Sequence, residues 1–296
     1  MTYPANLRPI LVFTVLSSIV LLLPPLAREA HPRLLPLEET ARAYLLVDTD
    51  TGEVLRAKNP HEALIPASLT KVMALRVAFR ALREGRVGLQ DSVTVSVRAW
   101  GFRPPLRGTS LIFLQPGKPA TVEQLIEGMA VASGNDASVA LAEHIAGSVT
   151  AFVEMMNQEA ERLGLRSARF YDPHGLSPQN RISGADMLRL ALATMRDYPE
   201  ILDYASRPSI TYNDITQYNN LRLVGRFEGV DGLKTGFLSA SGFNVVATAK
   251  RGDRRLMTVV MGTPRRINGQ RGGHVRDRLA SELLTMGFES LHAATN

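Results

Sequence analysis

The sequence predicts an α/β fold of the α+β kind, in which an antiparallel sheet is flanked by helices and interrupted by an inserted all-helical lobe. Strand-like runs lie near both ends of the chain, at 43–57 and 243–262. The segments between about 88 and 200 are dominated by helical periodicity. Strands from both ends can share one sheet if the helices between them form a lobe of their own.

Length and composition agree with a folded enzyme-sized domain. The 296 residues can form one large domain or two closely joined lobes, and the 45% apolar content is that of a globular protein. The formal charge of +6 is spread along the chain, which indicates a solvated surface, or attraction to an acidic envelope polymer or lipid surface, and not nucleic-acid binding. The lack of cysteine excludes disulfides and a cysteine nucleophile.

Residues 1–30 have the pattern of an export signal. Arg8 precedes the apolar run 10–23, which Pro24 and Pro25 break. This run is long enough for the apolar part of a signal peptide but short for a membrane span. No cleavage site is well defined, so an N-terminal membrane anchor is the alternative. Both interpretations predict an exported protein, in the periplasm or on the extracytoplasmic face of the cell membrane, with a linker at 31–42.

The folded part is expected to begin with a β-hairpin. Strand-like segments at 43–48 and 53–57 flank the turn residues 49–52. A helix is predicted next, because residues 72–82 are good helix formers without Gly or Pro. Ser68 and Lys71 lie three residues apart at its start, and this spacing places both side chains on one helix face.

The central segments are predicted from their strand patterns and helix caps. Short strands are expected at 92–95 and 108–114. Thr121 and Gln124 form a capping box, and Ser183 with Asp186 caps a later helix. Helices are therefore expected from 121 to about 132, then at about 136–146, 150–164 and 183–195, with a loop at 165–182.

The C-terminal third returns to strands. A short strand is expected at 210–212, and two strong strands at 243–249 and 256–262 flank the turn 250–253. A helix is predicted over 274–288. Residues 291–296 are expected to be a tail.

Three short motifs carry the chemistry: Ser68-x-x-Lys71, Ser133-Gly134-Asn135 and Lys234-Thr235-Gly236. Each has a structural alternative, namely a serine helix cap, a glycine helix end and a strand edge. A serine hydroxyl is a weak nucleophile unless a base or cation activates it, and Lys71 can do so. The order and spacing of the three motifs are less common than any one of them, with 65 positions between the two serines.

The combination resembles the serine penicillin-recognising acyl-transferases, which comprise penicillin-binding proteins and class A β-lactamases. Ser-Gly-Asn as the middle motif is similar to the low-molecular-weight D-alanyl-D-alanine carboxypeptidases of peptidase family S11. The similarity covers about residues 40–290 and includes further matching segments at 136–137, 142–143, 152–153, 156–157, 174–176 and 231–237. It implies a β-lactamase/transpeptidase-like fold with one catalytic domain over 43–290, whose helical lobe spans about 88–200.

The resemblance also implies catalytic roles. Ser68 would attack the carbonyl between two D-alanines, and Lys71 would act as its base or as an electrostatic activator. Ser133 would pass a proton to the leaving D-alanine. It implies no metal and no organic cofactor.

Substrate-binding roles follow in the same way. Asn135 would hydrogen-bond the substrate amide, and Lys234 with Thr235 would receive the terminal carboxylate. Gly236 would let the edge strand approach the substrate closely. The backbone N–H groups of Ser68 and Phe237 would form the oxyanion hole.

The activity so implied is that of a serine-type D-Ala-D-Ala carboxypeptidase, which trims peptidoglycan stem pentapeptides and is acylated by β-lactam antibiotics. Two alternatives stay open: a D,D-endopeptidase that cuts cross-links, and a non-catalytic penicillin-binding scaffold of the cell wall. A class A β-lactamase is disfavoured, because residues 165–181 contain no glutamate to activate a deacylating water.

Overall fold

The computed structural model describes residues 36–295. The expected signal or anchor at 1–30 and the first part of the expected linker therefore lie outside the described residues. The rest of that linker is not extended chain. Leu37–Thr40 form a 3-10 turn (η1) that contacts the C-terminal helix, and Thr40 is buried.

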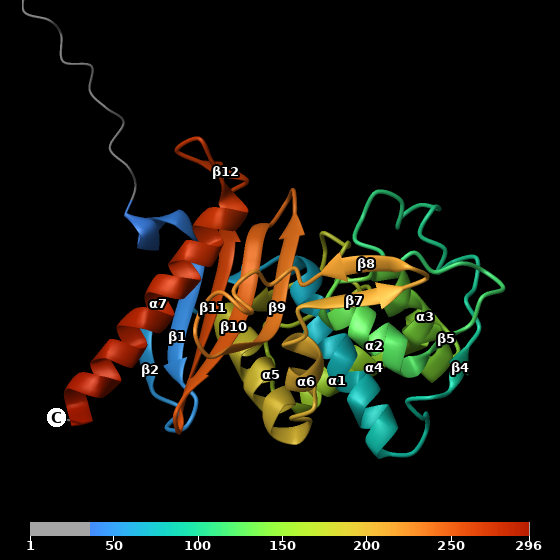
Figure 1. Ribbon diagram of the computed structural model, residues 1–296, viewed down its shortest axis with the longest axis horizontal. Helices are drawn as coiled ribbons and strands as arrows, with labels where there is room; N and C mark the ends of the chain where they lie inside the picture. The colour runs from blue at the N-terminus through green and yellow to red at the C-terminus, as the bar shows by residue number, and fades with distance from the viewer. Residues whose placement is uncertain (1–35, 296) are drawn as a thin grey trace, which may run out of the picture. The chain divides into compact units, whose positions relative to one another are not determined.

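A five-stranded antiparallel sheet is the centre of the fold (Figure 1). Its order is β2-β1-β11-β10-β9, so the two N-terminal strands share one sheet with three C-terminal ones, as the sequence predicts. Tyr44 lies opposite Val260 in this register. The strands are β1 (Ala43–Asp48), β2 (Val54–Lys58), β9 (Val230–Leu238), β10 (Gly242–Arg251) and β11 (Arg254–Thr263).

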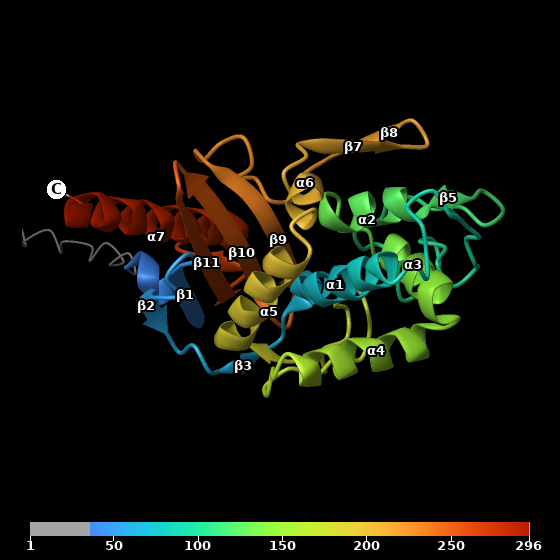
Figure 2. The ribbon, with the colours of Figure 1, turned by 90° about the horizontal axis from the view of Figure 1, so that it is seen from below.

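Helices cover both faces of the sheet (Figure 2). The long C-terminal helix α7 lies on one face, and α5 packs against β1 and β11 from the other. Beyond α5 the remaining helices form the predicted lobe. The helices are α1 (Thr70–Arg83), α2 (Val122–Ala130), α3 (Asn135–Ala146), α4 (Val149–Arg162), α5 (Gly184–Asp197), α6 (Ile201–Ala205) and α7 (Gly272–Thr295).

Alternate residues of the strands supply two separate cores. Leu46 and Val260 belong to the cluster under α7, whereas Leu45 and Val259 belong to the larger cluster shared with the helical lobe. Successive side chains of a strand point to opposite faces, so a strand buried on both faces is apolar throughout. This explains why β1, β10 and β11 are apolar over most of their length.

Four two-stranded ribbons connect these elements. Their strands are β3 (Ala63–Leu64) with β6 (Ile182–Ser183), β4 (Ser92–Val93) with β5 (Ala120–Thr121), β7 (Ser209–Tyr212) with β8 (Ile215–Tyr218), and β12 (Arg266–Ile267) with β13 (Gln270–Arg271). In the short β7–β8 hairpin, β8 is a strand that the sequence pattern does not predict.

Two local predictions are wrong. Residues 108–114 are irregular and not a strand, because the backbone N–H groups of Ile112 and Leu114 donate to the buried carboxylate of Asp136 at 3.0 Å each. Residues 291–295 are not a tail, because α7 continues through them. The capping boxes and caps at Thr121 and Ser183 are confirmed.

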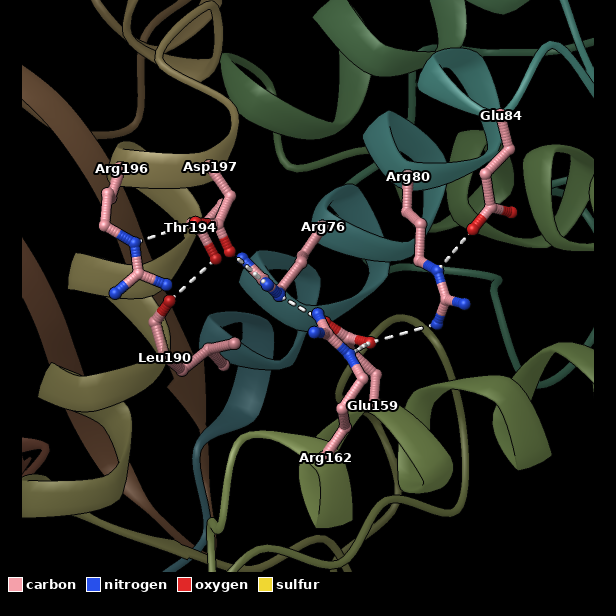
Figure 3. Close-up of polar contacts among 9 residues, drawn as sticks. All are labelled: Arg76, Arg80, Glu84, Glu159, Arg162, Leu190, Thr194, Arg196 and Asp197. Atoms are coloured by element: carbon pink, nitrogen blue, oxygen red, sulfur yellow. Dashed lines mark hydrogen bonds and ion pairs between the residues drawn. The ribbon is translucent and has the colours of Figure 1, made fainter.

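A buried ion-pair cluster joins α1 to α4 and α5 (Figure 3). Arg76 on α1 has a fully buried side chain, and its Nε donates to Glu159 on α4 at 2.5 Å. Its Nη2 donates to Asp197 on α5 at 2.6 Å. Arg80 and Arg162 also contact Glu159. These bonds fix α1, which carries Lys71, against the rest of the lobe.

Within residues 36–295 no single helix has both the length and the apolar composition of a membrane span. Only α3 and α4 taken together, bent by 86°, meet that criterion.

Candidate active site

Ser68 lies in a 3-10 turn, η2 (Ala67–Leu69), which leads directly into α1. The serine helix-cap alternative is wrong, because Leu69 is the N-cap of α1 and no side chain caps either segment. Ala67 is held at φ 51°, in the left-handed region. Two neighbours hold this conformation. Asn244 on β10 donates to the carbonyl of Pro66 at 3.0 Å, and Gly175 packs against the Ala67–Ser68 peptide.

Gly175 is required by this close approach. A Cβ atom at this position would lie 1.9 Å from the carbonyl oxygen of Ala67, and its φ of +93° is one that L residues rarely adopt. The loop that carries Gly175 is therefore part of the nucleophile's support.

Lys71 is fully buried and directed at Ser68. Its Nζ lies 3.2 Å from Ser68 Oγ, 2.6 Å from Asn135 Oδ1 and 2.7 Å from the carbonyl oxygen of His174. The last two are acceptors only. A neutral amine has two N–H bonds, which these acceptors occupy, so its lone pair remains for the hydroxyl of Ser68.

The surroundings of Lys71 favour that neutral form. Burial lowers the pKa of Lys71 well below its ordinary value, and the positive charge of Lys234 lowers it further. Asp172 and Asp136 oppose this shift without cancelling it. A lysine with a lowered pKa can accept the proton of a serine near neutral pH.

The loop before α5 supplies the His174 carbonyl. The carboxylate of Asp172 accepts backbone N–H groups of His174 and Gly175 and the side-chain amide of Asn180. Burial lowers the pKa of His174 to about 4, so its ring is neutral, and Nδ1 accepts from the backbone of Leu176 at 3.3 Å. None of the three motifs lies in this loop, so the motifs do not mark it as part of the site. The stretch Asp172-Pro173-His174-Gly175 could have indicated the loop, because it places a turn-forming carboxylate close to a glycine.

Ser133 and Asn135 enter the same site from the start of α3. Ser133 has φ 63°, and its Oγ is buried without a hydrogen-bond partner. Asn135 is the first residue of α3, and its side chain contacts Lys71. The left-handed residue here is Ser133 and not Gly134, so the glycine helix-end alternative is wrong.

Lys234, Thr235, Gly236 and Phe237 lie on β9, the edge strand of the sheet. Lys234 is 2% exposed, and within the described chain its Nζ has one recorded hydrogen bond, to the carbonyl of Thr235 at 3.3 Å. A Cβ atom on Gly236 would lie 2.8 Å from the carbonyl oxygen of Pro66 and 3.0 Å from Ser68 N. The small residue therefore brings β9 against the nucleophile turn.

A cavity of about 520 Å³ collects the expected residues. Its lining includes Ser68, Ser133, Asn135, Thr235, Gly236 and Phe237, while Lys71 and Lys234 are buried beside it. The structure thus brings together all eight residues that the sequence singled out. It adds four charged residues and a histidine from the loop before β9, from β13 and from α7, which no motif indicates: Arg222, Arg271, His274, Arg276 and Asp277.

Lys234 is poised to change charge near neutrality. Burial lowers the pKa of Lys234 to about 7, and the positive charge of Arg276 contributes. The ammonium form therefore predominates below pH 7 and is lost above it. An anion that binds beside Lys234 is expected to prefer the lower pH range.

If Lys234 receives the terminal carboxylate, as the resemblance implies, the affinity for a peptide ending in D-Ala-D-Ala is expected to fall above pH 7, by about tenfold per pH unit at most, because the lysine loses its charge there. Calorimetry between pH 6 and 9 on the Ser68→Ala variant measures this without turnover. Binding at pH 8 should take up about one proton. A Lys234→Gln variant should bind weakly and with little pH dependence. Equal affinity at pH 6 and pH 9 in the Ser68→Ala variant would contradict the assignment.

Comparison with known proteins identifies the family. The family model described as D-alanyl-D-alanine carboxypeptidase, Peptidase S11, matches residues 28–265. The chain belongs to this family.

Two D-alanyl-D-alanine carboxypeptidases are similar to this chain over most of its length. D-alanyl-D-alanine carboxypeptidase DacC of Escherichia coli K12 is 38% identical over 94% of this chain and 69% of its own length. DacD of the same organism is 45% identical over 77% of this chain and 59% of its own length. The chain thus spans between about three fifths and seven tenths of these two relatives.

The solved structures confirm the predicted fold. Penicillin binding protein 5 from Haemophilus influenzae superposes with a TM-score of 0.79 at 40% identity, covering 84% of this chain and 71% of that chain. The fold is therefore that of the penicillin-binding proteins, with the five-stranded sheet and the helical lobe on either side of the cavity.

Proposed function

We propose that this protein is a serine-type D-Ala-D-Ala carboxypeptidase that removes the terminal D-alanine from peptidoglycan stem pentapeptides. The observation that carries the proposal is the fully buried Lys71, whose Nζ lies 3.2 Å from Ser68 Oγ with its other contacts made to acceptor oxygens. Membership of the Peptidase S11 family supports it.

The first step is acylation. Ser68 Oγ attacks the carbonyl carbon between the two D-alanines, its proton passes to neutral Lys71, and the carbonyl oxygen takes the negative charge. The backbone N–H groups of Ser68 and Phe237 receive this oxyanion, because β9 and the nucleophile turn approach within contact distance at Gly236. The terminal carboxylate binds Lys234 and Thr235, and Asn135 holds the substrate amide.

The second step releases D-alanine. The C–N bond breaks as the proton held by Lys71 passes through the hydroxyl of Ser133 to the leaving nitrogen. Ser133 suits this transfer because its Oγ is buried without a hydrogen-bond partner beside the cavity. Lys71 is then neutral again and can take a proton from the water that attacks the ester. The bond between the acyl carbon and Ser68 Oγ breaks, and the proton returns from Lys71 to Oγ, which regenerates Ser68.

The same site would accept β-lactam antibiotics, whose strained amide takes the place of the peptide bond. The name of penicillin binding protein 5, a structural neighbour, supports this step. The loop from 165 to 181 lacks a glutamate, so we expect the penicilloyl ester to be long-lived. The export pattern of residues 1–30 supports action outside the cytoplasm, in the periplasm or at the membrane surface, where the stem peptides lie.

Intact-mass spectrometry after incubation with benzylpenicillin tests the proposal. We expect one stable adduct per molecule on the wild type and none on Ser68→Ala, because Ser68 is the serine beside Lys71. In parallel, the wild type should release D-alanine from an acetylated tripeptide ending in D-Ala-D-Ala. An adduct without any peptide hydrolysis would instead support the non-catalytic scaffold.

The endopeptidase alternative shares the chemistry and differs in the leaving group. A cross-linked muropeptide offered at the same concentration separates the two activities. Faster cleavage of the cross-link than of the terminal D-alanine would overturn the carboxypeptidase assignment, while leaving Ser68 as the nucleophile.

A further inference from the structure

The charges that line the catalytic cavity are unevenly placed. The lining contributed by the loops around residue 110 and residue 176 and by the start of α3 is uncharged. The charged lining residues all come from the loop before β9 and from the region where α7 begins: Arg222, Arg271, Arg276 and Asp277, with His274 among them. The cavity therefore has a neutral side and a cationic side.

The cationic side continues outward from Lys234. Arg276 is 5% exposed and close enough to Lys234 for its charge to help lower the pKa of that lysine. Arg222 and Arg271 in turn help to lower the pKa of Arg276, after the larger effect of its burial. The positive charges thus form a row that begins beside the expected carboxylate position and ends at the exposed side chains of Arg222 and Arg271.

The outer members of this row lack acidic partners. The one acidic lining residue, Asp277, accepts from Arg276 Nε at 2.9 Å. Arg222 contacts the ring of His274, with Nη1 and Nε2 2.7 Å apart, and the Arg271 guanidinium lies 5.6 Å from the centre of the Phe243 ring. In residues 36–295 no carboxylate is recorded within ion-pair distance of Arg222 or Arg271.

The start of α7 adds to the same field. Gly273 and His274 belong to its first turn and line the cavity. The N-terminal end of a helix carries partial positive charge, which favours an anion nearby. Two guanidinium groups and a helix end therefore lie on one side of the cavity, where the one acidic lining residue, Asp277, is already paired with Arg276.

We propose that Arg222 and Arg271, with His274 and the start of α7, form a second anion subsite that selects leaving groups carrying a negative charge besides the terminal carboxylate. This inference rests on the proposed function, because the leaving residue is the one whose carboxylate binds Lys234 and Thr235. The row of cations extends outward from the position expected for that carboxylate. The ligand class is a C-terminal D-amino acid with an acidic side chain, or a larger amine bearing an extra carboxylate.

Three acetylated tripeptides that differ in the last residue test the subsite. They end in D-Ala, D-Glu or D-Gln, and D-Gln has the shape of D-Glu without its charge. We expect the wild type to hydrolyse the D-Glu peptide with a kcat/KM about fivefold above that of the D-Gln peptide, as for a partly exposed ion pair. In the double variant Arg222→Gln/Arg271→Gln this ratio should fall to about one. Raising the salt concentration should also move the wild-type ratio toward one.

A matched control comes from the same helix. Arg278→Gln removes one exposed positive charge of α7 that lines a different cavity, beside Leu37 and Thr40, so its ratio should equal that of the wild type. A ratio of one in the wild type, an unchanged ratio in the double variant or an equal loss in Arg278→Gln would each overturn the subsite. The subsite would also be overturned if an added negative charge raised kcat/KM only on the acyl side of the scissile bond, as in an N-succinyl peptide. Hydrolysis of the D-Ala peptide by the wild type tests the proposed function separately.

Discussion

Replacing Lys71 by methionine is expected to reduce kcat/KM for a D-Ala-D-Ala peptide by about 10²–10⁴-fold, the range that a positioned general base supplies. Methionine preserves the length and apolar stem of the side chain in a site where Lys71 is fully buried. The loss should therefore come from the missing amine. Steady-state kinetics and the rate of adduct formation with benzylpenicillin both measure it.

The pH dependence of acylation separates the two roles open to Lys71. The lowered pKa means that the neutral amine, the form able to take a proton, is gained as the pH rises through a value well below that of an ordinary lysine. If Lys71 is the base, the acylation rate rises with pH over that range and then levels, and this rise is absent from Lys71→Met. An acylation rate that falls as Lys71 loses its proton would show that the ammonium acts electrostatically.

Replacing Glu159 by alanine is expected to lower the free energy of unfolding by about 3–5 kcal/mol, because it removes the fully buried carboxylate partner of Arg76 and leaves the partly exposed Asp197 as its remaining one. Glu159 and Arg76 both have side chains with no exposed surface, and Arg76 Nη1 has no hydrogen-bond partner even in the intact cluster. Urea denaturation measures the change. The exposed neighbour Glu161, changed to alanine, should alter stability by no more than about 0.5 kcal/mol.

Replacing both Arg76 and Glu159 tests whether the buried charge left by Glu159→Ala causes the loss of stability. The double variant Arg76→Met/Glu159→Leu should be more stable than Glu159→Ala, since well-packed apolar side chains can replace a buried ion pair. Burial alone would raise the pKa of Glu159, but hydrogen bonds from Arg162 and Arg76 outweigh it and lower the pKa. Its contribution is thus present above the ordinary carboxyl pKa and lost as the pH falls through the lowered value. A Glu159→Ala variant as stable as Glu161→Ala would show that the cluster contributes nothing net.

The sequence predicts the helix caps well, because each cap is contiguous and its local structure is set by its own neighbours. The caps at Thr121 and Ser183 are of this kind, since a side-chain oxygen bonds an N–H three residues on. The segment 108–114 shows the opposite case. Its apolar run suits a strand, but the carboxylate of Asp136 on α3 takes the N–H groups that a strand would have paired.

The site residues that no motif indicates could not be predicted for a similar reason. Arg222 and Arg271 reach the cavity from the loop before β9 and from β13, and no short pattern in the chain marks them. The support of Ser68 by Asn244 and Gly175 depends on packing between segments more than a hundred residues apart. Such contacts follow from the order of strands in the sheet, which local patterns do not specify.

The pairing of β1 with β11 has a consequence for how the protein reaches its active form. This contact joins residues such as Tyr44 and Val260, so a loop of more than two hundred residues must close before the middle of the sheet exists. Loop closure on that scale is entropically unfavourable until many contacts form together, and chains rich in distant contacts fold slowly. A hydrogen bond from Asn244 on β10 to the carbonyl of Pro66 holds the turn that carries Ser68. This turn is therefore assembled only after the last strands have been synthesised and paired. Acylation by penicillin is therefore expected to report completed folding of the whole domain, from its first strand to its last.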